Sequence, residues 1–356
     1  MPTPAILFGG PSPEHDISVS TGLQAAHTLG NVLAIYWAKN GGFHLVDADS
    51  EVTDFADGVP RRARELAFDA RPGQGWILKR KPLDISVVIN CCHGGPGEDG
   101  TIQGAMDMVG YRYTGPGQTG SALGMDKLAF GASVANAGLP SLPRLLLGPG
   151  VAPGFGGPYI VKPRFGGSSI GIEVADDLDT ALALLKSSPH LTQGAVIEPF
   201  LSDFRDLNIA VRTHPTLSLS NIEEPRKSGD GLYSYEQKYL AWGGTGAPAN
   251  TVPADVDPAL AAQIREIAPQ VAALVGVRSV ARIDFLDTGG TLYVNEINTI
   301  PGSLSAKLFV DPPVSRKELL DGMVAEALAS PPRGFSTHGA DGTALRNAST
   351  IASKLG

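Results

Sequence analysis

The sequence contains little cysteine: its 356 residues include two, which are neighbours at Cys91 and Cys92. Adjacent residues of a strand point to opposite faces, so we do not expect a disulfide between them. Their spacing is not that of a metal site either. We interpret both as small, buried apolar residues in a reducing compartment.

Basic residues and long apolar runs are also scarce. The chain has 28 Lys and Arg against 36 Asp and Glu, a net charge of −8, which argues against a nucleic-acid partner. A few lysines can still form a local phosphate site. No apolar run approaches the length of a membrane span, and the N-terminus lacks the basic start and cleavage site of a signal peptide. We therefore expect a cytoplasmic protein with no membrane partner.

The length of the chain predicts two or three domains. Residues 4–8 are an apolar strand that runs into a glycine turn at residues 9–15, and residues 18–29 have helical spacing. This is the first unit of a parallel α/β sheet. A later strand, residues 85–92, ends at a second glycine turn, residues 93–100. Ligand sites in such sheets lie at the C-terminal ends of strands, which is where both turns fall.

Polar side chains on these two turns are ambiguous when taken alone. Glu14 and His15 lie at the end of the first turn, and His93 and Glu98 lie on the second. An acidic residue near a helix N-terminus is an ordinary stabilising feature. None of the four would support a function by itself.

The second half of the chain alternates apolar strands with helices. Strands are predicted at residues 159–162, 195–198 and 207–211, and a helix at residues 317–329. Asp257 and Pro258 are typical of an N-cap and first turn, and Gly276 of a helix end. The helix between them should bury a stripe formed by Leu260, Ile264, Ile267, Val271 and Leu274.

Two alternating segments near residue 290 carry the most informative side chains. Residues 282–286 and 292–298 read as strands, and the Gly-Gly turn between them predicts a hairpin. They present Asp284, Glu296 and Asn298, with Glu296 and Asn298 on one face. Two carboxylates and an amide oxygen suit Mg²⁺, which usually completes its shell with nucleotide phosphates. A solvated sheet edge explains Asp284 alone, but the whole cluster favours a magnesium–nucleotide enzyme.

A lysine and a glycine–serine loop predict a phosphate site. Lys162 ends a strand directly before Gly166, Gly167, Ser168 and Ser169. Glycines let backbone N–H groups approach phosphate oxygens, and the lysine adds a charge. The order is not that of a P-loop, because the lysine precedes the glycines.

Two weaker signals surround this site. Lys127, near a helix start, would by itself be a solvated lysine. The long polar segment of residues 223–249 contains aromatic residues, Lys238 and Tyr239. Long segments of this kind are usually lids or disordered, and the aromatic content favours a lid.

Taken together, these motifs resemble the D-alanine–D-alanine ligase family of ATP-grasp enzymes. The matching segments occur in family order and cover the chain to about residue 330; they are residues 9–22, 93–104, 113–115, 125–127, 161–171, 235–239, 282–285 and 295–302. The resemblance implies an N-terminal parallel α/β domain (1–115) and two α+β lobes of an ATP-grasp fold (116–203 and 204–330). Residues 331–356 are expected to be a poorly ordered tail.

The resemblance implies that ATP converts one amino acid to an acylphosphate, which the amine of a second amino acid attacks. The leading expectation is that the product is D-alanyl-D-alanine for peptidoglycan. The family also suggests a homodimer. The implied ATP contacts are Lys127, Lys162, Lys238, Ser168, Ser169, the hinge Glu198, Pro199, Phe200 and Leu201, and Asp206. Asp284, Glu296 and Asn298 match the ligands of two Mg²⁺ ions, for which Mn²⁺ can substitute.

The resemblance also assigns the substrate contacts. Glu14 matches the residue that binds the first substrate's ammonium, and His93 one near its carboxylate. Arg282 and the Gly302 N–H match groups that stabilise the tetrahedral intermediate. Ser168 and Tyr239 match groups that join Glu14 to the closed lid.

One segment departs from the family pattern. After Gly302 the family commonly continues to a serine that holds the second substrate's carboxylate, and this chain has Lys307 there, with Ser303 and Leu304 also changed. Lysine can still pair with a carboxylate, but it is longer and charged. A different acceptor, such as another amino acid or a hydroxy acid, is therefore the alternative. A non-catalytic nucleotide-binding regulator is a weaker one.

Overall fold

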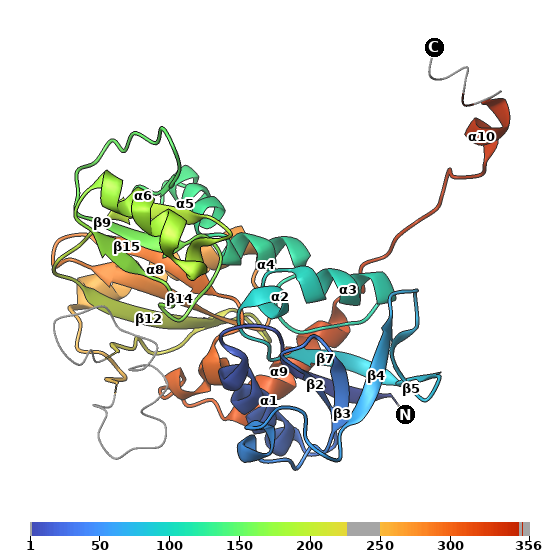
Figure 1. Cartoon of the computed structure of the whole chain (residues 1–356). Helices are drawn as coiled ribbons and strands as arrows, with labels where there is room; N and C mark the ends of the chain where they lie inside the picture. Colours follow the sequence, from blue (N-terminus) through green and yellow to red (C-terminus); the bar gives the residue numbers. More distant parts are fainter. Residues whose placement is uncertain (1, 226–249, 349–350, 352–356) are drawn as a thin grey trace.

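The computed structural model describes residues 2–225, 250–348 and 351. The N-terminal part forms a seven-stranded sheet in the order β6-β5-β4-β3-β2-β1-β7 (Figure 1). Its strands are β1 (Thr3–Gly9), β2 (Leu33–Trp37), β3 (Phe43–Val46), β4 (Arg64–Asp69), β5 (Gly75–Leu78), β6 (Lys81–Pro82) and β7 (Ile85–Asn90). The helices of this part are α1 (His15–Leu29), η1 (Val52–Phe55), α2 (Gly95–Glu98) and α3 (Thr101–Val109).

The predicted parallel α/β unit is confirmed in the centre of this sheet. Strand β1 pairs in parallel with β2 and with β7, whereas β3, β4, β5 and β6 pair antiparallel. Because β1 and β7 run in the same direction, the glycine turns that follow them meet at one edge of the sheet. This edge faces the rest of the molecule.

A second sheet of four antiparallel strands has the order β10-β9-β11-β8. Its strands are β8 (Leu145–Leu146), β9 (Tyr159–Pro163), β10 (Glu173–Ala175) and β11 (Ala195–Pro199), and its helices are α6 (Leu178–Ser187) and η2 (Pro189–Leu191). Before it lie α4 (Gln118–Met125) and α5 (Lys127–Asn136). Asp126 caps α5 by accepting from the backbone N–H groups of Leu128 and Ala129.

A third sheet, with the order β13-β12-β14-β15, is also antiparallel and is covered by a long helix. Its elements are β12 (Arg205–Arg212), β13 (Ser218–Leu219), α8 (Pro258–Val275), β14 (Val280–Asp287) and β15 (Leu292–Asn298). The predicted caps of α8 are confirmed: Asp257 accepts from Ala259, and Gly276 is left-handed. Leu274 was wrongly placed in the buried stripe, since it is 37% exposed near the end of α8.

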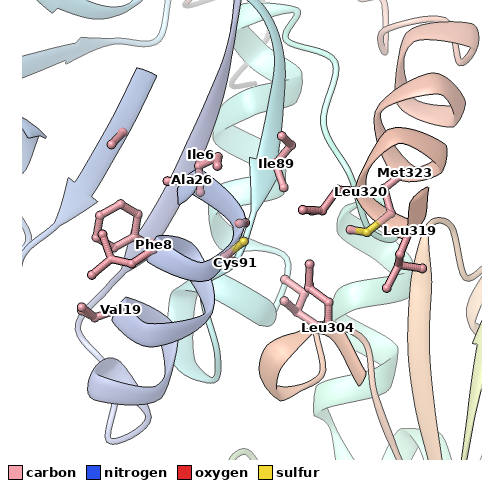
Figure 2. Close-up of a cluster of buried hydrophobic side chains, with 14 of the residues drawn as sticks. Ile6, Phe8, Val19, Ala26, Ile89, Cys91, Leu304, Leu319, Leu320 and Met323 are labelled. Carbon is pink, nitrogen blue, oxygen red and sulfur yellow. The ribbon is translucent and has the colours of Figure 1, made fainter. Parts of the chain in front are cut away.

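After β15 the chain returns to the first sheet. The short helix η4 (Gly302–Leu308) and α9 (Arg316–Ala329) pack against α1, β1 and β7. Figure 2 shows this core, in which Leu304 of η4 lies with Ile89, Leu320 and Met323. The segment that follows the β14–β15 hairpin is therefore fixed against the N-terminal sheet.

The cysteines and the tail complete the fold. Both thiols are free and buried, and Cys91 and Cys92 enter different core clusters, as expected for opposite faces of a sheet. Beyond α9 the chain leaves the body and carries a short exposed helix, α10 (Thr343–Asn347) (Figure 1). Among the described residues, no helix is long and apolar enough to cross a membrane.

Candidate active site

A cavity of about 260 Å³ has walls from the second sheet, the third sheet and η4. It collects residues that the sequence had singled out in separate motifs. The predicted site residues that line it are Lys127, Lys162, Ser168, Ser169, Glu198, Pro199, Phe200, Leu201, Asp206, Arg282, Asp284, Glu296, Asn298, Gly302, Ser303 and Lys307.

The predicted hairpin places the three oxygen donors side by side. Asp284 of β14 lies directly opposite Glu296 of β15, and Asn298 Nδ2 donates to Asp284 Oδ2 at 3.1 Å. Arg282 also donates to Asp284, from Nε to Oδ1 at 2.6 Å. The register slips by one residue between Asp284 and Phe285, so Asn295 is an extra residue in β15. Such a bulge re-aims side chains, and here Asn295, Glu296 and Asn298 all reach the cavity.

The two predicted lysines lie on the same wall within a buried network. Lys162 Nζ donates to Glu198 Oε2 at 2.8 Å and to Asn295 Oδ1 at 3.1 Å. Lys127 Nζ donates to the Gly166 carbonyl and lies 3.7 Å from Glu296 Oε2. Burial lowers the pKa of Lys127, with Lys162 and Arg144 adding to the effect and Glu296 opposing it.

Arg144 completes this network, and sequence reasoning missed it. Its Nε donates to Glu198 Oε1 at 2.5 Å, and its terminal nitrogens donate to the carbonyl oxygens of Lys127 and Asn295 at 2.6 and 3.1 Å. Burial alone would raise the pKa of Glu198, but Lys162 and Arg144 outweigh burial and hold it below its ordinary value. Both side-chain oxygens of Glu198 are therefore engaged within the protein.

The glycine–serine loop brings Glu14 to the site. Ser168 Oγ donates to Glu14 Oε1, a contact that the family resemblance implied. A Cβ added at Gly167 would lie 3.0 Å from Glu14 Oε2, so a side chain there would crowd the carboxylate. Glu14, Lys127, Gly167, Glu296 and Asn298 line a smaller pocket that shares a wall with the main cavity. Glu14 thus lies next to the oxygen cluster.

His93 is buried behind the wall of the site instead of lining either of these pockets. Its Nδ1 lies 2.6 Å from the Ile300 carbonyl oxygen, and its Nε2 lies 2.8 Å from Thr21 Oγ1. Because the carbonyl can only accept, Nδ1 carries the proton and Nε2 accepts from Thr21. Burial lowers the pKa of His93 to about 4, although the bond to Ile300 opposes this.

Glu98, which the sequence left ambiguous, holds the same segment. Its Oε1 accepts from the Ile300 N–H at 2.8 Å and from Thr299 Oγ1 at 3.1 Å, and its Oε2 accepts from the Gly94 N–H at 2.9 Å. Burial and the nearby Glu14 raise its pKa to about 7 against these bonds. The second glycine turn therefore fixes both the N–H and the C=O of Ile300, two residues before Gly302.

The far end of the cavity carries the residue that departs from the family pattern. Lys307 Nζ pairs with Glu223 Oε1 at 2.5 Å, and Asn250 Nδ2 donates to the same oxygen at 2.7 Å. Glu223 had not been identified from the sequence. Lys238, Tyr239 and most of the expected lid lie outside the described residues, so the structure says nothing about them.

The residues that were missed have weak local signals. Arg144 is a single charge before an apolar strand. Glu223 is one of two adjacent acids. Each takes part in the site through a partner that is distant in the sequence.

The site is thus a cavity between two small sheets, lined by an oxygen cluster and paired lysines. The structure resembles a D-alanyl-alanine synthetase from Vibrio cholerae (TM-score 0.77, 23% identity, 92% of this chain and 99% of that one). It also resembles a D-Ala:D-Ser ligase from Enterococcus faecalis (TM-score 0.75, 22% identity, 92% and 99%). At these identities the likeness concerns the fold.

Sequence similarity identifies the family. Residues 3–116 match the model of the D-ala D-ala ligase N-terminus, and residues 150–324 that of the C-terminus. The chain is 34% identical to a D-alanine–D-alanine ligase of Mycolicibacterium smegmatis, covering 91% of this chain and 95% of the relative. It is 32% identical to one from Bradyrhizobium, with the same coverage. The protein belongs to the D-alanine–D-alanine ligase family, whose members are ATP-dependent enzymes that form a carbon–nitrogen bond.

Proposed function

We propose that this protein joins two amino acids through an amide bond, using ATP, and that D-alanyl-D-alanine is its product. The observation that carries the proposal is the convergence on one site of the oxygen cluster, the lysine pair and the Glu14–Ser168 pair. These groups match the needs of phosphate, metal and amino-acid binding at a single centre.

ATP binds with its base along Glu198–Leu201, its ribose at Asp206 and its phosphates at Lys127 and Lys162. Glu198 and Pro199 end β11, Phe200 and Leu201 follow it directly, and all of these residues line the cavity, which supports this placement. Because both oxygens of Glu198 pair with Arg144 and Lys162, the backbone of the hinge rather than this carboxylate contacts the base. Ser168, Ser169 and Lys238 contact the phosphates, and Tyr239 acts with Ser168 to join Glu14 to the lid.

Asp284, Glu296 and Asn298 would hold two Mg²⁺ ions, or Mn²⁺ in their place. The donor set fits hard cations, since it offers two carboxylates in direct cross-strand register and a neighbouring amide, whose nitrogen donates to one of them at 3.1 Å and whose oxygen can serve as a ligand. When bound, the ions neutralise negative charge on the phosphoryl group during transfer. The third donor is an amide, so this cluster contains only two carboxylates, and no group of three His, Cys, Asp or Glu side chains that could hold a metal is found among the described residues.

Glu14 binds the ammonium of the first amino acid, which orients its carboxylate towards the γ-phosphate of ATP. The carboxylate oxygen attacks phosphorus and ADP leaves, giving an acylphosphate. The second amine then attacks the acyl carbon, and the carbon–oxygen bond to phosphate breaks. Arg282 and the Gly302 N–H stabilise the negative oxygen of the tetrahedral intermediate. His93 contributes by holding Ile300, and thereby the Gly302 turn.

The wider assignments follow from the same proposal. The three sheets are consistent with domains at residues 1–115, 116–203 and 204–330, followed by the tail at 331–356. We place the enzyme in the cytoplasm as a homodimer with small-molecule substrates, in peptidoglycan synthesis.

A related ligase with a different acceptor is the second candidate. The Glu223–Lys307 pair at the far end of the cavity favours it, because a charged pair there differs from the serine expected in the family. The two candidates share the first half-reaction and differ in the second.

A product screen tests both candidates. The purified protein is incubated with ATP, Mg²⁺ and single or paired amino and hydroxy acids, and products are identified by mass. D-alanyl-D-alanine formed with equal amounts of ADP and phosphate supports the first candidate, and a mixed product the second. ATP binding without turnover on any acid would contradict both.

A further inference from the structure

Four polar side chains form a row across the third sheet. Glu223 forms an isolated bridge with Asn208, Asn208 lies opposite Asp284, and Asp284 lies opposite Glu296. Directly opposed residues on neighbouring strands present their side chains on the same face, and all four line the cavity. With neighbouring strands about 4.8 Å apart, Glu223 lies roughly 10 Å from Asp284 along this row. The row therefore runs from the oxygen cluster to a separate carboxylate.

Glu223 is a buried charge that depends on its partners. The residue is 2% exposed, and its oxygens accept from Lys307 at 2.5 Å, Asn250 at 2.7 Å and Asn208 at 3.4 Å. Burial alone would raise the pKa of Glu223, but Lys307, the Asn250 amide and the more distant Arg282 hold it below its ordinary value. A buried carboxylate that loses its cationic partner is strongly destabilised.

Lys307 is the exposed half of this pair. Its side chain is 60% exposed, whereas that of Glu223 is 3% exposed. It lies near the end of η4, and the first half of η4 contains Ser303, Leu304 and Ser305, which all have positive φ angles of 48–54°. Leu304 is buried in the core and the Ser303 N–H donates to Thr21 Oγ1 at 3.0 Å, which holds this strained turn in place. The backbone is thus fixed, while the ammonium of Lys307 can move towards a ligand.

We propose that Glu223 and Lys307 form the acceptor site and select a zwitterion, an amino acid in preference to a hydroxy acid. The inference rests on the proposed ligase function. A zwitterion offers a carboxylate to Lys307 and an ammonium to Glu223, so two ion pairs replace the existing one. A hydroxy acid also draws Lys307 away, but it leaves Glu223 buried without a cation.

The pair differs from a purely structural ion pair in its position. Both residues line the cavity, together with Arg282 and Gly302. The neighbouring Glu224 shows the alternative arrangement: it pairs with Arg205 at 2.7 Å and is partly exposed. Glu224 therefore provides a matched control for substitution.

The test separates the two half-reactions. Hydroxylamine attacks the acyl carbon of an acylphosphate and releases phosphate, so hydroxamate formation from D-alanine and ATP measures donor activation without the acceptor site. In a second assay, D-alanine and D-lactate compete as acceptors for the D-alanyl donor, and the two products are quantified by mass. The full-length proteins compared are wild type, Glu223→Gln, Glu223→Asp and Glu224→Gln.

Wild type is expected to favour the amide product over the ester. Glu223→Gln should lower this preference about 10- to 100-fold, the range that corresponds to losing a charge-assisted contact, while hydroxamate formation stays unchanged. Glu223→Asp, which keeps the charge, should restore part of the preference, and Glu224→Gln should match wild type.

Two results would overturn the inference. One is an unchanged product ratio in Glu223→Gln with normal hydroxamate formation. The other is a wild-type protein that uses D-lactate as readily as D-alanine. Failure of wild type to form hydroxamate would instead reject the ligase function itself, and this inference with it.

Discussion

His93 Nδ1 lies 2.6 Å from the carbonyl oxygen of Ile300, a contact that spans 207 residues of sequence. Together with Glu98, this contact ties the second glycine turn to the segment that precedes Gly302. The histidine is neutral in this arrangement, because each ring nitrogen has one role: Nδ1 donates and Nε2 accepts. Its protonation would place a second donor against Thr21.

Stability should therefore fall in acid through His93. Its pKa is lowered from 6.5 to about 4 by burial, so the unfolded chain binds the proton first. The stabilising contribution is complete above pH 6.5 and is lost as the pH falls towards 4, by about 3 kcal/mol at most. His93→Asn, which keeps a donor for Ile300, should flatten this part of the curve. Denaturant unfolding at several pH values between 7 and 4 measures the difference.

Glu98 acts in the opposite direction over an overlapping range. Its pKa is raised to about 7, so its contribution is present below about pH 4.5 and is lost as the pH rises through 7. Glu98 is present in both wild type and His93→Asn, so the difference between their stability curves isolates the contribution of the histidine. Parallel curves for the two proteins would show that His93 does not titrate as described.

Glu296→Gln should lower ATP turnover by about 100-fold or more while leaving the fold intact. Glu296 lies opposite Asp284 and within 3.7 Å of Lys127, so its negative charge lies between a proposed metal ligand and a proposed phosphate contact. Steady-state ADP release at saturating substrates, over a range of Mg²⁺ concentrations, measures the effect. Near-normal turnover in a folded variant would reject the metal assignment.

Arg144→Met should destabilise the protein by about 3–5 kcal/mol and raise the Michaelis constant for ATP. The guanidinium is 3% exposed and is one of two cations that pair with Glu198, so its removal leaves a buried carboxylate poorly compensated. Arg144→Lys should show a smaller effect, because lysine keeps the positive charge but cannot reproduce the three hydrogen bonds of the guanidinium.

The exposed Arg71, which pairs with Asp69 on the surface, supplies the control for this substitution. Arg71→Met should leave the unfolding midpoint and the ATP constant unchanged. Equal effects of the two methionine variants would mean that Arg144 has no special role.

Lys307→Ser should raise the Michaelis constant for the second substrate about tenfold or more and leave that for the first unchanged. A charge-assisted contact to a carboxylate contributes roughly 1.5–3 kcal/mol, and Lys307 lies at the cavity end that we assign to the acceptor. The two constants are separated by initial rates over a wide range of D-alanine concentration. Small and equal changes would show that Lys307 does not contact the acceptor.

The sequence predicted the parts of the site that depend on local pattern. Alternation and the Gly-Gly turn identified the β14–β15 hairpin, and with it Asp284, Glu296 and Asn298. The caps of α8 were predicted for the same reason, because capping depends on residues close in sequence. The bulge at Asn295 was not predicted, since one extra residue in a strand leaves the surrounding alternation almost unchanged.

The remaining contacts depend on distant partners. Arg144 meets Glu198 across 54 residues, and Lys307 meets Glu223 across 84. No periodicity links such residues, so the sequence could name Lys307 as unusual without indicating its partner. Likewise, the motif containing His93 was identified, but its burial behind the cavity wall required the packing of η4 against the first sheet.

Transfer of oxygen from the donor carboxylate to phosphate shows whether the reaction passes through an acylphosphate. D-alanine labelled with ¹⁸O in its carboxylate is incubated with the protein, ATP and Mg²⁺, and the released phosphate is analysed by mass. If the carboxylate attacks the γ-phosphate and the acyl carbon–oxygen bond then breaks, each phosphate formed with dipeptide carries one labelled oxygen. Unlabelled phosphate released alongside dipeptide would contradict an acylphosphate intermediate in this site.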